Sequence, residues 1–355
     1  MKKLKALVWA MCLLSASCLA QTPESSIRDE AQRLRSAVDH ASDGEAWKDV
    51  KPIATEALSN CGAALERGRL YLAVLELGRA ERLISAATYG DGSSADASAF
   101  KERWSKERGQ LAKYTEASLR NGDWKAPLAI RALEEAARGQ VLPTIDAAQA
   151  YAPVTEVKYG QYYLGEARGL ADFSRAVRAM KFAEAPMSPT VRSIAPELQV
   201  LQSKANDAFK PPLSREKHGQ FIRLNSTLKI AEELNSAGLY AGAWYEYLTA
   251  LIQYSALQAP TVEAAEQSAL KARVAAELQK SASTGTDDSL RRLFLEQAEA
   301  ALENEKPSAA DLTKASLILN VVLPGYSELV NGAAKSPVPN ATKLATVTLV
   351  RWPYT

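Results

Sequence analysis

The chain has 355 residues, of which 43 are basic, 41 are acidic and 47% are hydrophobic. This length is enough for one extended domain or two compact ones. The balanced charge gives no field that would draw the protein to nucleic acid or to an anionic membrane, so we expect neither as a partner.

Residues 1–20 have the pattern of a signal peptide. Three lysines within the first five residues precede a mostly apolar run over 4–14, and small residues follow up to Ala20. The apolar run is shorter than the roughly 20 residues that a membrane-spanning helix needs. We therefore expect cleavage after Ala20 and export to the periplasm or the extracellular space. An uncleaved, buried N-terminal helix is the alternative.

Cys18 offers a different way of processing the N-terminus. It resembles the lipidated cysteine of bacterial lipoprotein signals, in which an aliphatic residue usually stands three places earlier. Ser15 occupies that place here, with Leu14 one residue further back. Attachment to a membrane is expected only if Cys18 is lipidated. Cleavage after Ala20 would instead leave Cys61 as the one cysteine, which cannot form an internal disulfide.

The rest of the chain is rich in Ala, Leu, Glu and Arg, which favours helices almost everywhere. Prolines, glycines and polar clusters interrupt the helical pattern at short intervals, including at RGQVLP (138–143) and PGY (324–326). In chain order, the patterns predict helices over 27–38, 52–65, 70–86, 95–119, 127–137, 154–183, 213–236, 240–256, 260–281, 287–304 and 308–323.

The short breaks between these segments predict the architecture. Helices joined by short turns lie antiparallel to their neighbours, so we expect an all-α bundle or a solenoid of stacked hairpins. A proline-rich connection over 186–212 would divide an N-terminal helical region, 21–185, from a C-terminal one, 213–330. Residues 331–355 are predicted to form a linker and a short extended tail.

One hairpin, over 225–256, carries a specific spacing of small and large residues at Gly238, Tyr240, Ala243, Tyr247 and Ala250. Small residues would allow two helices to approach closely, tyrosines would fill the space beside them, and a glycine would end the first helix with a positive φ. This spacing resembles a tetratricopeptide repeat, a pair of antiparallel helices. A weaker copy covers 57–80, with Gly68 at the turn. The match is partial, because Thr227 stands where the family has a large aromatic residue. The resemblance rests on the five residues Gly238, Tyr240, Ala243, Tyr247 and Ala250.

No pattern in the chain predicts catalytic, cofactor-binding or metal-binding residues. His40 and His218 lie far apart and outside any metal-ligand spacing, and Cys61 falls at a small-residue packing position in a helix. Adjacent acidic residues on a helix point about 100° apart, so they do not converge by themselves. The pairs Glu134–Glu135 and Glu232–Glu233 are therefore expected on solvated helix faces.

Two sets of aromatic residues are candidates for binding a partner. Tyr159, Tyr162 and Tyr163, together with Arg168, form the most aromatic stretch, and Tyr and Arg are favoured at binding surfaces. The alternative is that Tyr159 and Tyr163, four residues apart, pack between helices. In the repeat-like hairpin, we expect Trp244 and its neighbour Glu246 to point outward, because the residues next to them would be packed.

These observations predict a secreted, all-α scaffold that binds another protein on the concave face of its helical stack, without catalysis and without a cofactor. Two alternatives remain open. A cell-envelope enzyme acting on cell-wall polymer would need two acidic side chains within about 10 Å of each other in a cleft. A bundle that binds a small apolar ligand would need an enclosed pocket of roughly 300 Å³ or more.

Overall fold

A computed structural model describes residues 22–42, 44–91, 96–120, 124–151, 157–183, 188–209, 214–258, 266–281 and 286–335. The predicted signal peptide, Cys18 and the predicted tail beyond residue 335 lie outside these ranges. The predicted all-α fold class, a helical bundle or solenoid, is confirmed. Within the described ranges, no helix is both long enough and apolar enough to cross a membrane.

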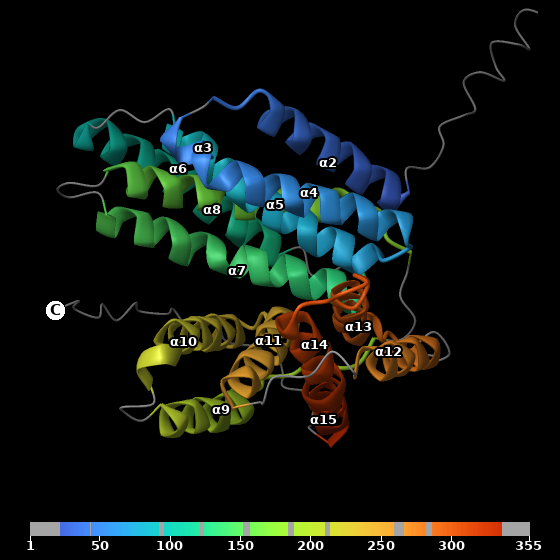
Figure 1. The fold of residues 1–355 in the computed structure, drawn as a ribbon. Coiled ribbons are helices and arrows are strands. Elements are labelled where there is room, and N and C mark those ends of the chain that lie inside the picture. The colour runs from blue at the N-terminus through green and yellow to red at the C-terminus, as the bar shows by residue number, and fades with distance from the viewer. Residues whose placement is uncertain are drawn as a thin grey trace, which may run out of the picture.

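The helices form two groups, which Figure 1 shows one above the other. The N-terminal group contains the short helix α3 (Glu45–Lys48) and long helices that lie side by side: α2 (Pro23–Asp39), α4 (Val50–Glu66), α5 (Leu70–Asp91), α6 (Ala97–Arg120), α7 (Leu128–Tyr151) and α8 (Val157–Ala179). The C-terminal group contains α9 (Ala195–Ala208), α10 (Ser214–Ser236), α11 (Tyr240–Gln258), α12 (Gln267–Ser281), α13 (Ser289–Ala301), α14 (Ala309–Leu317), the π-helix η2 (Ile318–Val322) and α15 (Leu323–Lys335).

Two hairpins, α4–α5 and α10–α11, share one turn structure. Gly68 and Gly238 end the first helix of each pair, with φ of 69° and 76°. The residue after each glycine donates its N–H to a carbonyl five residues earlier, Arg69 to Ala64 at 2.8 Å and Leu239 to Leu234 at 2.9 Å. This is the Schellman pattern, which satisfies carbonyls that a helix end leaves free. The predicted roles of both glycines are confirmed, while membership of the tetratricopeptide family stays a prediction.

Two predicted breaks are wrong. Helix α7 continues through Pro143, which lies inside it. The PGY sequence lies within a continuous helical run from Ala309 to Lys335, where η2 precedes Pro324. Proline cannot donate a backbone hydrogen bond. Before Pro324, a π-turn changes the donor–acceptor register, so the helix continues past this proline. Leu323 N–H accordingly donates to Ile318 O, five residues back. The run therefore extends five residues into the predicted linker.

Glycines set the closest contacts between helices of different hairpins. On α8, Gly169 lies against the α5 backbone, where an added Cβ would come within 2.8 Å of Glu81 O. On α11, Gly242 lies against α7 in the same way, 2.8 Å from Ala136 N. These contacts place α8 against α5 and α11 against α7, although neither pair is consecutive in the chain.

Side chains of one group cap helix N-termini of the other. Leu72 N–H at the start of α5 donates to Glu296 Oε2 of α13 at 2.9 Å, and Leu128 N–H at the start of α7 donates to Asp287 Oδ2 at 2.7 Å. Gly242 N–H at the start of α11 donates to Glu135 Oε2 of α7 at 3.0 Å. Helix N-termini carry unsatisfied donors and partial positive charge, so these carboxyls fix how the two groups meet. Within the predicted connection 186–212, the described part includes α9.

Candidate functional site

The predicted aromatic stretch lies on α8, and its members differ in accessibility. Tyr159 is 45% exposed and lies near the start of the helix. Tyr162 and Tyr163 are half-buried against the core, with their rings edge to face and centroids 6.2 Å apart. Tyr159 is therefore the most exposed of the three tyrosines.

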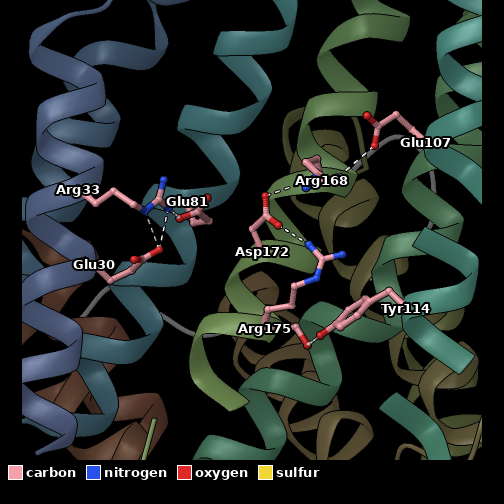
Figure 2. Close-up of polar contacts among 9 residues, drawn as sticks. Glu30, Arg33, Glu81, Glu107, Tyr114, Arg168, Asp172 and Arg175 are labelled. Atoms are coloured by element: carbon pink, nitrogen blue, oxygen red, sulfur yellow. Dashed lines mark hydrogen bonds and ion pairs between the residues drawn. The ribbon is translucent and has the colours of Figure 1, made fainter. Parts of the chain in front are cut away.

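Arg168, the fourth member of the predicted patch, holds two helices together. Its Nε donates to Asp172 at 3.1 Å and its Nη1 donates to Glu107 of α6 at 3.3 Å (Figure 2). Asp172 also accepts from Arg175, whose guanidinium lies 4.3 Å from the Tyr114 ring centroid. Because its donors are committed to this network, Arg168 contributes to packing between α6 and α8.

A second set of polar contacts in Figure 2 attaches α2 to α5. Arg33 donates to Glu30 of its own helix at 2.7 Å and to Glu81 of α5 at 2.5 Å. Glu81 is almost fully buried, and that burial raises its pKa to about 7, with Arg33 offsetting part of the effect. This ion pair therefore joins α2 to a buried side chain of α5.

Trp244 is not on the outward face that the sequence predicted. It is 0% exposed, and its Nε1–H donates to Arg192 O at 3.0 Å. Glu246 is also buried, at 9% exposed. Both predictions were wrong because α11 is covered on several sides: it contacts α7, α10, η2 and α14, so a residue beside a packed one is packed as well.

Cys61 was predicted at a packing position, and the structure places it in the hydrophobic core. Cys61 is completely buried, and burial raises the pKa of its thiol to about 12, so the thiol stays protonated and unreactive at neutral pH. His40 Nδ1 lies 2.7 Å from Ser36 O at the end of α2, and the His218 ring lies 5.9 Å from the Phe209 ring. In the described ranges, no group of three or more His, Cys, Asp or Glu side chains could hold a metal ion.

The acidic pair Glu134–Glu135 was predicted on a solvated face, and this prediction was wrong. Glu134 is 1% exposed and accepts from Arg138 and Ser174, both at 2.8 Å. Glu135 caps α11 at Gly242. The two carboxyls point to different neighbours, as adjacent helical residues do, and each satisfies buried donors.

A cleft lies at the junction of the two groups, and we call it the junction cleft. It consists of two adjoining hollows that share Glu76, Arg79, Gln297 and Lys314. The charged hollow, about 480 Å³, lies between α4–α5 and α13–α14 and is lined by four acidic and four basic side chains. The mixed hollow, about 310 Å³, is bounded by α5, α7, α8 and α11. Helices from both ends of the chain thus build one site.

The lining of the mixed hollow combines apolar and polar groups. Leu75, Leu133, Leu170, Phe173 and Tyr245 supply apolar surface. Across from this surface, the shared residues bring charge and hydrogen-bonding groups into the same space. Such a combination is typical of ligand sites, where apolar walls give affinity and a few polar groups give orientation.

Two polar atoms of the shared wall lack partners. Among the described residues, neither Glu76 Oε2 nor Gln297 Nε2 has a hydrogen-bond partner. Arg79 Nη1 lies 3.6 Å from Glu76 Oε2, which is too long for a good hydrogen bond. Burial raises the pKa of Glu76, and Arg79 and Lys314 offset part of that effect. An unsatisfied buried polar group costs about 1–3 kcal/mol, so these atoms favour a ligand that pairs with them.

Two further ionisable groups, Glu246 and Lys314, line the mixed hollow. Burial raises the pKa of the Glu246 carboxyl to about 7, with Arg82 partly offsetting it. Arg82 itself lies 3.5 Å from Glu166. Burial lowers the pKa of Lys314, and Glu76 opposes this. The junction cleft therefore combines ionisable groups of both signs with one unpartnered acceptor, Glu76 Oε2, and one unpartnered donor, Gln297 Nε2.

Comparisons with protein families, with curated proteins and with solved structures find no match to this chain. The junction cleft was also missed by reasoning from the sequence. Glu76 and Gln297 each look like ordinary polar positions on amphipathic helices, and only the packing of α5 against α13 brings them together. No local signal in the sequence identifies them.

Proposed function

We propose that the protein is an exported helical scaffold that binds a segment of another protein in the junction cleft. One observation carries this proposal: a cleft at the junction of two helical groups combines apolar walls with the unpartnered buried atoms Glu76 Oε2 and Gln297 Nε2. Unsatisfied groups in a concave, partly apolar site are better explained by a ligand than by stability, which they lower.

The test is peptide binding to the mature protein. Peptides that bind the wild type are first selected from a random library. Their affinities for the wild type and for Ala137→Phe, which places a ring in the mixed hollow, are then measured by fluorescence anisotropy. Ala237→Phe is the matched control, because Ala237 is exposed in the α10–α11 turn. We expect Ala137→Phe to lose affinity at least about tenfold and Ala237→Phe to retain it. The proposal fails if no peptide binds saturably, or if both variants bind as the wild type does while circular dichroism shows them folded.

Export is part of the proposal and rests on the pattern of residues 1–20. Mass analysis of the N-terminus after expression with the leader distinguishes the three expected forms. A chain that begins at Gln21 supports cleavage after Ala20. A lipid-modified Cys18 would mean membrane anchoring, and an intact Met1 would overturn export.

A cell-envelope enzyme is the second candidate function, and one observation favours it. Glu76 and Glu246 both line the mixed hollow, and burial raises the pKa of each. A carboxyl with a pKa near 7 suits general acid catalysis. Release of soluble fragments from purified cell-wall polymer, abolished by Glu246→Gln, would favour this candidate over binding alone. The third alternative, an apolar ligand, fits the volume of about 310 Å³ but not the charged lining.

A further inference from the structure

We propose that the junction cleft recognises the main chain of an extended peptide together with one apolar side chain, and that net charge contributes little to the recognition. This inference rests on the proposed function and specifies the partner's chemistry. The occupant is a short extended segment of a protein, with its apolar residue in the mixed hollow and its flanking residues towards the shared wall of Glu76, Arg79, Gln297 and Lys314.

The unpartnered atoms specify what the occupant must offer. Glu76 Oε2 requires a donor, whereas Gln297 Nε2 requires an acceptor. A ligand with only one kind of group would leave the other kind unsatisfied. A peptide main chain carries one N–H donor and one carbonyl acceptor per residue, so it supplies both kinds within a few ångströms.

The apolar wall specifies the side chain. Leu133 of α7, Leu170 and Phe173 of α8, and Tyr245 of α11 line a volume of about 310 Å³. Gly78 allows the Phe173 ring to lie against α5, because an added Cβ would come within 2.9 Å of that ring. The volume suits one large apolar side chain, and burying such a side chain contributes about 1.5–3 kcal/mol.

The charges specify what the occupant need not offer. In the mixed hollow, Arg79, Arg82 and Lys314 face Glu76 and Glu246, and Arg82 is shared with Glu166. The charged hollow is lined by equal numbers of acidic and basic side chains. Its Arg69 already donates to Glu299 at 2.7 Å and also pairs with Glu303. A strongly acidic or basic segment would meet repulsion as well as attraction, so the favoured segment is near neutral.

A chemically modified peptide series tests this inference. Starting from a peptide that binds the wild type and loses affinity in Ala137→Phe, each backbone amide is N-methylated in turn, and each apolar residue is replaced by alanine. We expect one or two methylations and one alanine replacement to weaken binding by about tenfold each, the size of one lost hydrogen bond or one buried side chain. Raising the salt concentration from about 50 mM to about 500 mM is expected to change affinity less than threefold.

Two matched protein variants complete the test. Gln297→Leu removes the unpartnered amide of the shared wall, whereas Gln253→Leu removes a buried unpartnered amide that lines neither hollow. We expect only Gln297→Leu to weaken binding, by about fivefold to tenfold. Unchanged binding on methylation, a large salt effect, or equal effects of the two variants would overturn the inference while leaving cleft binding intact. Equally tight competition by free leucine would also overturn it, because a small zwitterion would then be the occupant.

Discussion

Replacing Glu296 with glutamine should change how the stability of the protein depends on pH. Glu296 is 1% exposed and lies at the junction of the two helical groups, where it accepts from Leu72 N–H at 2.9 Å and from Arg292 Nε at 3.1 Å. Burial raises its pKa from 4.5 to about 7, and the two hydrogen bonds only partly offset that effect. The carboxyl therefore holds a proton more tightly in the folded protein than in the unfolded chain.

The sign of the effect follows from this difference. Between about pH 4.5 and pH 7 the folded state binds more protons at this site than the unfolded state, so the free energy of unfolding falls as the pH rises. The contribution is fully present below about pH 4.5 and is lost as the pH rises through 7. A shift of about 2.5 units from 4.5 to 7 corresponds to roughly 3 kcal/mol. Glutamine has no charge to bury, so Glu296→Gln removes this loss.

Urea unfolding followed by circular dichroism at about pH 4.5, 6 and 8 measures the effect. The difference in free energy of unfolding between Glu296→Gln and the wild type should grow in favour of the variant by about 1–3 kcal/mol as the pH rises from about 4.5 to about 8. This range allows for a weaker contact with Arg292. The exposed Glu305→Gln variant is the control. If the difference between Glu296→Gln and the wild type is the same at all three pH values, burial does not raise the pKa of this carboxyl as argued.

Four further substitutions probe the fold. Gly238→Ala should cost about 1 kcal/mol in urea unfolding, because an L-residue at φ 76° is strained, and equal stability would contradict the αL turn. Gly242→Val should cost about 1–3 kcal/mol by overpacking α11 against α7, and a thermal melt that does not shift would show that the helices have room to separate. Trp244→Ala should cost about 3–5 kcal/mol, whereas Tyr159→Ala should stay within about 0.5 kcal/mol, and the reverse order would contradict the observed burial.

The elements that local chemistry determines were predictable from the sequence. Gly68 and Gly238 stand where a helix must end in the left-handed region, and each marks a hairpin that the structure contains. Pro143 and Pro324 misled the prediction, because proline is a local signal for a break whereas its accommodation depends on tertiary packing and on the π-turn at η2. The all-α class was predictable because it depends on composition summed over long windows.

The junction cleft could not be predicted because it depends on contacts between distant segments. Gln297 lies more than 200 residues after Glu76, and each residue alone fits the polar face of its helix. The prediction that Trp244 points outward failed for a related reason. The spacing within one hairpin identified Ala243 as packed, but it did not show that further helices cover the neighbouring face of α11. Periodicity indicates which face is buried against a first neighbour, and a helix inside a stack has several neighbours.

Stability and binding are connected at one turn of α13. Glu296 caps α5 at Leu72, while the next residue, Gln297, lies in the wall shared by both hollows. Adjacent helical residues point about 100° apart, so the contact that fixes α13 against α5 also sets where the Gln297 amide lies in the cleft. Glu296→Ala, which removes the cap, should therefore lower stability and peptide affinity together. Glu296→Gln, which can keep an acceptor for Leu72 N–H, should preserve affinity, and a loss of affinity equal to that of Glu296→Ala would separate the cap from the cleft.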